Sequence, residues 1–200
     1  MRALLIAFIV SAAVSAALSL TIGPQEFMKI VYMTPQGFVL IGRSLLAYWL
    51  VYPATGSELA AVFAAILFNN TVSLTVVLSA PAVIHLANSR GRRSGGRLRR
   101  SWLLRRCGWS CCRKAIAAIA IMYITVLGLS LSAAVLLWGP SLFMPLESAY
   151  VAIASITVYR SSHLQEEVFG VLYPKMVKKA LPAIAILLVS SALVEAYEIL

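Results

Sequence analysis

Long runs of apolar residues constrain this chain more than any other feature of its sequence. The first run, residues 3–22, is long enough for a helix that crosses a bilayer, which needs about 20 apolar residues. The runs do not alternate between apolar and polar residues, so they predict helices and not the strands of a membrane barrel. With 61% hydrophobic and 12% charged residues, a soluble domain could not cover this surface. We expect one all-α domain, a polytopic transmembrane helical bundle.

Five segments are expected to cross the membrane: residues 3–22, 59–86, 115–138, 146–159 and 180–197. The first could also be a signal peptide, but its apolar core is longer than usual for one, so we expect an uncleaved helix. A further segment, 37–52, is short and has Arg43 near its middle. Arginine is costly at the bilayer centre. This segment is therefore expected to be an interfacial or re-entrant helix, so that about five membrane helices and this one make the bundle.

A basic loop, residues 88–114, separates the second and third spans. Between Arg90 and Lys114 it holds ten of the seventeen lysines and arginines and no acidic residue. Such loops stay cytoplasmic, and they attract anionic lipids. We therefore expect a protein of the cell membrane with a cytoplasmic amino terminus and an outside carboxyl terminus. In this orientation, Lys29 and Arg43 are the only two of the seventeen lysines and arginines outside the membrane. The residues expected to contact lipid are Arg97, Arg99, Arg100, Trp102, Arg105, Arg106 and Trp109.

The sequence also argues against several function classes. Cys107, Cys111 and Cys112 all fall in the basic loop, and an odd number without neighbouring histidines predicts neither a disulfide framework nor a metal site. The chain has no aspartate, no catalytic triad and no phosphate-binding glycine loop, so we expect no enzyme and no cofactor. The net charge of +10 comes without a nucleic-acid-binding motif, so nucleic acid is not an expected partner.

Two adjacent asparagines, Asn69 and Asn70, lie in the middle of the second span. They cannot share one helix face, so at least one needs a partner on another helix or a backbone carbonyl. Hydrogen bonds between helices are one interpretation, and a polar conduit is the other. On the first span, Ser11, Ser15 and Ser19 recur every four residues, which predicts close packing of another helix along that stripe.

Two glutamates, Glu147 and Glu195, are the other candidate intramembrane residues. With Pro145 at the first position of a helix, Glu147 would be at the third, where free N–H groups and the helix dipole stabilise a carboxylate. Glu195 lies near the carboxyl end of the last helix, the wrong dipole end for an anion. It therefore needs water or a cation, and Arg43 or Lys29 are the candidates.

Three stretches carry a family resemblance: Phe68-Asn69-Asn70, Pro145-Leu146-Glu147-Ser148-Ala149 and Ala192-Leu193-Val194-Glu195-Ala196-Tyr197. In this order they resemble the stage II sporulation protein M family, small polytopic membrane proteins of bacteria and archaea, over roughly residues 59–200. The family's histidine-glycine after the proline is absent, and Ala87-Asn88-Ser89-Arg90 replaces its Asn-Gly step. Sporulation members of that family are membrane anchors that assemble partner proteins, including cell-wall hydrolases, and are not enzymes. For this chain the resemblance implies a non-enzymatic assembly role, but not a role at the cell wall.

The sequence thus predicts a non-enzymatic membrane protein that scaffolds partner proteins, as a homo-oligomer formed through small-residue faces. One alternative is a transporter or channel subunit in which Asn69, Asn70, Glu147 and Glu195 line a polar path. A weaker alternative is a sensor of anionic lipid that acts through the basic loop.

Overall fold

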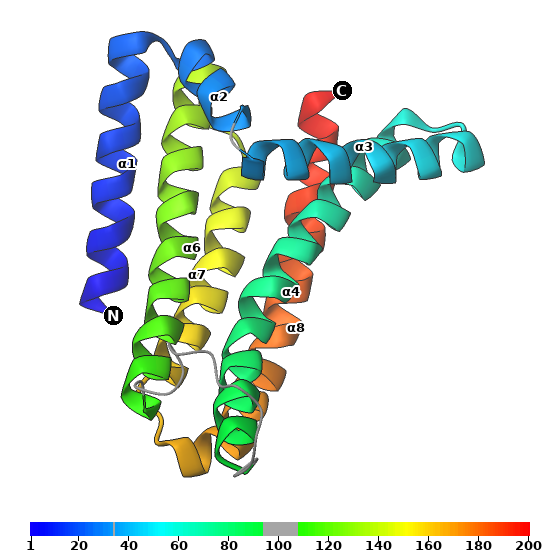
Figure 1. The fold of residues 1–200 in the computed structure, drawn as a ribbon. Coiled ribbons are helices and arrows are strands. Elements are labelled where there is room, and N and C mark those ends of the chain that lie inside the picture. Colours follow the sequence, from blue (N-terminus) through cyan, green and yellow to red (C-terminus); the bar gives the residue numbers. More distant parts are fainter. Residues whose placement is uncertain (34, 94–107) are drawn as a thin grey trace.

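The computed structural model describes residues 1–33, 35–93 and 108–200, and within these ranges the chain is helical and has no strand. Figure 1 shows the helices α1 (Arg2–Ile22), α2 (Pro24–Tyr32), α3 (Pro35–Thr55), α4 (Glu58–Arg93), α6 (Trp109–Trp138), α7 (Phe143–Ser161) and α8 (Glu166–Ile199). The all-α prediction is confirmed.

Four of the described helices, α1, α4, α6 and α8, are long and apolar enough to cross a membrane. They contain four of the five predicted spans, and the remaining one, residues 146–159, falls in α7, which is not among the four. The chain therefore has the composition of a multi-pass membrane protein.

The helices α1, α4, α6, α7 and α8 run side by side (Figure 1), and each points opposite to the one before it in this series. We call the end where α1 begins and α4 ends the basic end, and the end that holds the carboxyl terminus the opposite end. Among the largest fully buried side chains are Tyr150, Phe169, Ile116, Ile184 and Val158. These residues belong to α6, α7 and α8, so the centre of the core lies between these three helices.

Two glycines end helices where the sequence has Gly-Pro pairs. Gly23, with φ 88°, follows α1, and Gly139, with φ 82°, follows α6. A side chain is strained at such angles, so glycine is the residue that lets the chain turn there. Prolines inside the helices act differently, because α4 continues past Pro81 and α8 past Pro174 and Pro182.

Three helices, α4, α6 and α8, extend well beyond the segments predicted to be spans. The last span was expected to start at residue 180, but α8 begins at Glu166. The basic loop was expected from residue 88 to 114, but α4 runs to Arg93 and α6 begins at Trp109. A helix does not have to stop where the hydrocarbon layer stops, because polar side chains continue it into water. Hydropathy alone therefore does not give the ends of these helices.

The serine stripe of α1 packs against α6, as its spacing predicted. Ser15 and Ser19 are 0% exposed, and Ser15 Oγ donates a hydrogen bond of 2.7 Å to the carbonyl oxygen of Leu129. On the facing side, a Cβ atom added to Gly128 would lie 2.1 Å from Ser11 Oγ and 2.8 Å from the carbonyl oxygen of Phe8. Only glycine at position 128 allows α1 and α6 to approach this closely.

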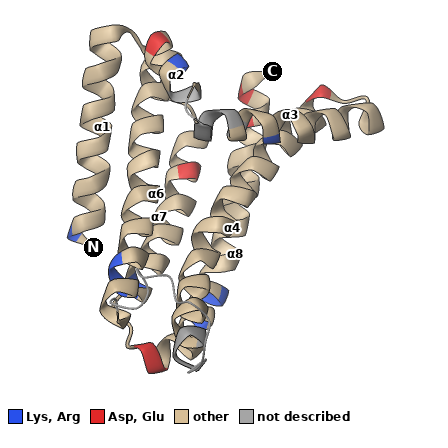
Figure 2. Cartoon of the chain, in the orientation of Figure 1, with Lys and Arg blue, Asp and Glu red and all other residues tan. Residues whose placement is uncertain are grey.

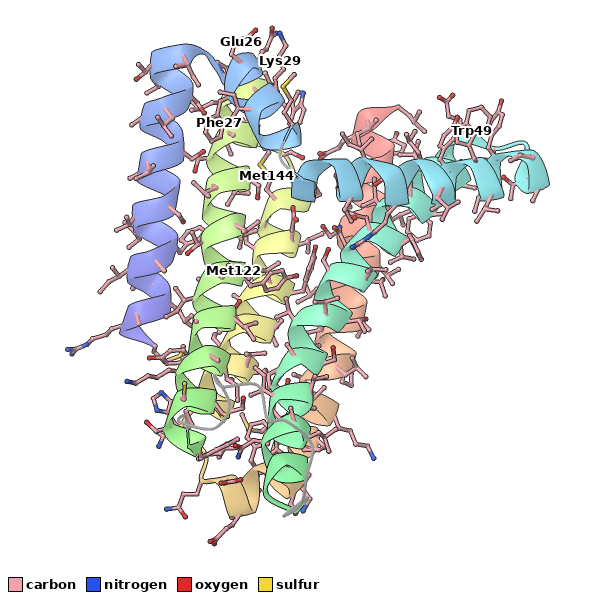
Figure 3. The ribbon with its side chains drawn as sticks, in the orientation of Figure 1. Glu26, Phe27, Lys29, Trp49, Met122 and Met144 are labelled. Atoms are coloured by element: carbon pink, nitrogen blue, oxygen red, sulfur yellow. The ribbon has the colours of Figure 1, made fainter. Side chains whose placement is uncertain are left out.

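Helix α3 runs crosswise to the bundle at the opposite end (Figure 1), where it packs against α4. Sequence analysis predicted a helix over 37–52, and the observed helix is longer by a few residues at each end. Before it, α2 carries an exposed ion pair in which Lys29 Nζ lies 2.6 Å from Glu26 Oε1 (Figure 3).

Candidate functional site

Glu147 does not lie at the start of a helix. Helix α7 begins at Phe143, so Pro145 is its third residue, Glu147 is its fifth, and the first turn holds no acidic residue. The helix starts earlier because Met144 is apolar and buried, at 4% exposure, and because proline is tolerated anywhere in a first turn, whose N–H groups have no helical partners. The free N–H groups therefore do not explain Glu147, and that prediction was wrong.

Glu147 instead belongs to a group of four ionisable residues from three helices, which we call the carboxylate cluster: Tyr123, Glu147, Tyr150 and Glu195. Tyr150 lies one turn further along α7 and interacts electrostatically with Glu147. Its charge interacts with Tyr123 of α6 and with Glu195 of α8. Sequence analysis named both glutamates but missed the two tyrosines, because nothing local in the sequence links positions 123 and 150.

The predicted cation partners of the carboxyl-terminal glutamates are not found in the described residues. Lys29 pairs with Glu26 instead. The Glu198 carboxylate accepts hydrogen bonds from the Leu142 backbone N–H, at 3.0 Å, and from Ser141 Oγ. The end of α8 is thus held by neutral donors of the turn between α6 and α7, and in the described part of the chain no lysine or arginine pairs with Glu195.

Asn69 and Asn70 are both half-buried on α4, and within the described ranges neither side chain has a hydrogen bond to another helix or to a backbone carbonyl. Asn69 Oδ1 is buried and has no hydrogen-bond partner among the described residues. Side-chain hydrogen bonds between α4 and α8 come from other residues: the Tyr173 hydroxyl donates to the Leu78 carbonyl oxygen at 2.5 Å, and Asn88 Nδ2 donates to Glu166 Oε1 at 2.7 Å. A buried acceptor without a donor costs about 1–3 kcal/mol. The Asn69 oxygen is therefore an acceptor that this chain leaves open.

An aromatic cluster closes the bundle at the basic end. His85 stacks on Phe169 with ring centroids 4.9 Å apart, and Trp109 meets both rings edge-on. Trp109 Nε1 also donates a 2.9 Å hydrogen bond to the Leu164 carbonyl oxygen. Trp109 was expected to contact lipid from the basic loop, but it begins α6 and its ring lies between helices. The other residues expected to contact lipid, Arg97, Arg99, Arg100, Trp102, Arg105 and Arg106, lie outside the described residues.

The described residues contain no group of three or more histidine, cysteine, aspartate or glutamate side chains placed to hold a metal ion. Of the three cysteines, Cys111 is half-buried and Cys112 is buried at the start of α6, while Cys107 lies outside the described residues.

Comparison of this chain with family models, with curated proteins and with solved structures gives no match.

Proposed function

We propose that this chain is a multi-pass protein of the cell membrane in which α7 is a fifth span and α3 lies at the outer interface. The alternating directions of α1, α4, α6, α7 and α8 support this topology (Figure 1). Charge supports the orientation, because lysine and arginine gather at the basic end (Figure 2), and basic residues favour the cytoplasmic side. The amino terminus is then cytoplasmic and the carboxyl terminus outside.

We further propose that the protein is a non-enzymatic assembly platform. The observation that supports this proposal is that α3 turns its apolar side chains away from the rest of the chain. The side of α3 that packs on the rest of the chain consists of Arg43, Ser44, Ala47, Tyr48 and Val51, which are buried or half-buried. The side that faces away, which we call the outer face of α3, consists of Ile41, Leu45, Leu46, Trp49 and Leu50. Its leucines are 52–68% exposed and Trp49 is 66% exposed; Figure 3 labels Trp49 on this helix.

This arrangement reverses the usual one, in which an amphipathic helix turns its apolar side toward its own core. An apolar face that the described residues leave uncovered, on a helix that crosses the bundle, is the kind of surface that binds another protein or the membrane. A second copy of this chain is the partner we propose. The resemblance to the stage II sporulation protein M family agrees with an assembly role.

The test is the mass of the purified protein in mild detergent, measured by native mass spectrometry. Leu46 and Leu50 are one turn apart on the outer face of α3, at 57% and 68% exposure. Replacing both by alanine should convert the oligomer to a monomer. The matched control is the pair Ile186→Ala and Leu193→Ala on α8, whose residues are 67% and 52% exposed. A wild-type monomer, or the same loss of mass in both double variants, would contradict the proposal.

A second candidate function, membrane transport, is favoured by one specific observation, the carboxylate cluster. Two carboxylates of adjacent helices interact without a paired lysine or arginine among the described residues, and ionisable groups within a membrane mark ion pathways by default. Cation flux into liposomes that contain the protein would test this function. Flux that Glu147→Gln abolishes would favour transport over an assembly role.

A further inference from the structure

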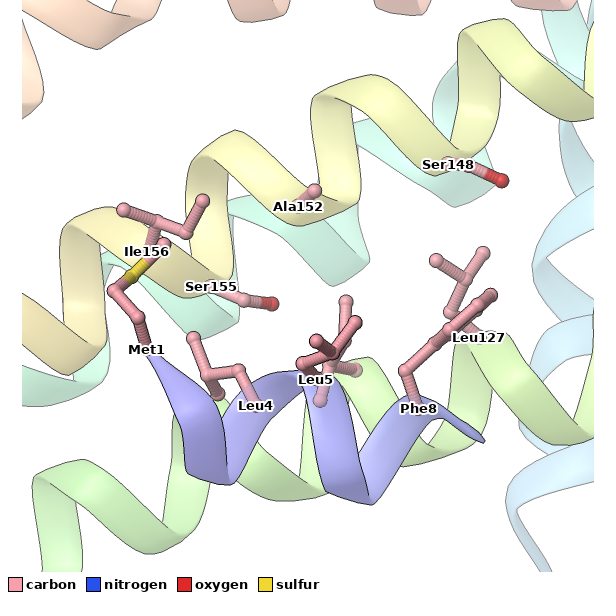
Figure 4. Close-up of a pocket in the computed structure, with 10 residues that line it drawn as sticks. Met1, Leu4, Leu5, Phe8, Leu127, Ser148, Ala152, Ser155 and Ile156 are labelled. Carbon is pink, nitrogen blue, oxygen red and sulfur yellow. The ribbon is translucent and has the colours of Figure 1, made fainter. Parts of the chain in front are cut away.

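A cavity of about 270 Å³ lies between α1, α6 and α7 (Figure 4). Its walls are almost entirely apolar and include Leu5 and Phe8 of α1, Leu127 of α6 and Ala152 of α7. An apolar protein cavity of about 150 Å³ already holds a benzene ring, so this one has room for several methylene groups. Left empty, its walls would lose their dispersion contacts on one side.

The cavity opens toward the surface that lipid covers. Leu5 and Met1 both line it, yet they are 61% and 56% exposed. The side chain of Met1 is unbranched and flexible, so it does not close the opening. A lipid tail can therefore enter from the bilayer without unfolding any helix.

Ser155 adds an independent sign of a ligand. It is 0% exposed, and its Oγ has no hydrogen-bond partner among the described residues. Other hydroxyls of α7 donate to carbonyl oxygens of their own helix: Ser148 to Met144 at 2.7 Å, Thr157 to Ile153 at 2.8 Å and Ser161 to Val158 at 2.7 Å. Ser155 instead points from α7 toward the cavity and α1 (Figure 4).

Two arginines lie close in the sequence to residues that line the cavity, although neither is itself among the lining residues. Arg2 adjoins Met1, and Arg160 lies one turn beyond the cavity residue Ile156 on the same side of α7. In the part of the chain that the structure describes, neither forms an ion pair, since the pair found there is Lys29 with Glu26. Ser155 precedes Arg160 by about 7.5 Å along the helix axis. A phosphate bound to the arginines would therefore place the ester group of a lipid tail near Ser155.

We propose that this cavity binds one tail of an anionic membrane phospholipid. The phosphate contacts Arg2 and Arg160, an ester oxygen accepts a hydrogen bond from Ser155, and the tail runs between α1 and α7 toward Phe8 and Ser148. Moving a lipid tail from the bilayer into an apolar cavity gives no hydrophobic free energy, because both surroundings are apolar. The free energy of binding therefore comes from the dispersion contacts that fill the cavity and from the polar contacts. Only the choice of the cytoplasmic leaflet rests on the orientation proposed above; the cavity does not depend on it.

The experiment uses the full chain in mild detergent and phosphatidylglycerol, with bound lipid counted by native mass spectrometry. Ser155→Ala removes the donor and should weaken binding about fivefold, the equivalent of one ordinary hydrogen bond. Ser148→Ala is the matched control, because Ser148 lines the same cavity but its hydroxyl is already bonded to Met144. Ala152→Leu should fill the cavity and abolish binding, and Arg2→Gln with Arg160→Gln should remove the preference for phosphatidylglycerol over phosphatidylcholine.

A phosphatidylglycerol with a photoreactive tail then locates the site, and its cross-links should fall within residues 1–8, 124–127 and 148–156, the three segments that line the cavity. Cross-links elsewhere, or equal binding by Ser155→Ala and Ser148→Ala, would overturn the proposal. Lipid binding and cross-linking can be measured whether or not the protein forms oligomers or transports ions. Their outcome is therefore independent of the tests of assembly and transport. Thermal midpoints of the variants identify any that fail to fold, and Ser155→Ala, which removes one atom, keeps the site testable if Ala152→Leu does not fold.

Discussion

Replacing Gly128 by alanine tests the close packing of α1 on α6. The added Cβ would lie 2.1 Å from Ser11 Oγ, 2.8 Å from the Phe8 carbonyl oxygen and 3.2 Å from the Ala12 backbone nitrogen. The Ser11 hydroxyl can rotate away, but the two backbone atoms cannot move unless α1 itself moves. The helices must then separate, which also stretches the 2.7 Å hydrogen bond from Ser15 to Leu129.

The magnitude follows from three opposing effects. Forcing an extra carbon into a packed interface costs about 1–3 kcal/mol, and losing a hydrogen bond between membrane helices costs about 0.6 kcal/mol. Alanine regains up to about 1 kcal/mol because it is the better helix former. We therefore expect Gly128→Ala to lower the free energy of unfolding by about 1–2.5 kcal/mol. Adding Ser11→Ala should recover only part of this loss, because the contact with the Phe8 carbonyl oxygen remains.

Denaturant unfolding of the detergent-solubilised protein, followed by circular dichroism, measures these differences. Gly42→Ala is the matched control, because Gly42 is also helical but an added Cβ there meets no atom within 4 Å. This control should be neutral or slightly stabilising. If Gly128→Ala were as mild as Gly42→Ala, or if Ser11→Ala restored full stability, backbone contact between α1 and α6 would not be what position 128 protects.

Three further changes test other parts of the structure. Tyr173→Phe removes the hydroxyl that donates to Leu78 and should lower the free energy of unfolding by about 1 kcal/mol, whereas Tyr197→Phe, at a residue 77% exposed, should change nothing in the same denaturant titration. Asn69→Leu should leave the free energy of unfolding unchanged or raise it, because it removes a buried acceptor that has no donor among the described residues; a clear loss of stability in the same titration would show that the amide is hydrogen-bonded. Glu147→Gln removes one of two interacting carboxyl groups and should raise the thermal midpoint at alkaline pH, where both groups would carry a charge; a lower midpoint there would show that the charge is held by a partner such as a bound cation.

The sequence was informative where a rule depends on neighbours along the chain. Apolar runs predicted the four long helices, and the four-residue spacing of Ser11, Ser15 and Ser19 predicted the face of α1 that packs on α6. The same kind of rule failed for Glu147, because the burial of Met144 in the tertiary fold, and not Pro145, decides where α7 begins. Residues that meet only in three dimensions, such as Tyr123 with Glu147 or Trp109 with Phe169, leave no periodic signal in the sequence.

Helix α3 shows why polarity predicts packing less well in a membrane than in water. In water the apolar side of a helix must turn inward, so the sequence pattern gives the buried face directly. In lipid an apolar side chain is stable on either face, and close packing of small and polar side chains decides which face meets another helix. Ala47, at 8% exposure, faces α4, while Leu50, at 68%, faces away. A hydropathy pattern could identify α3 as a helix near the interface, but it could not assign the outer face of α3, on which the proposed assembly depends.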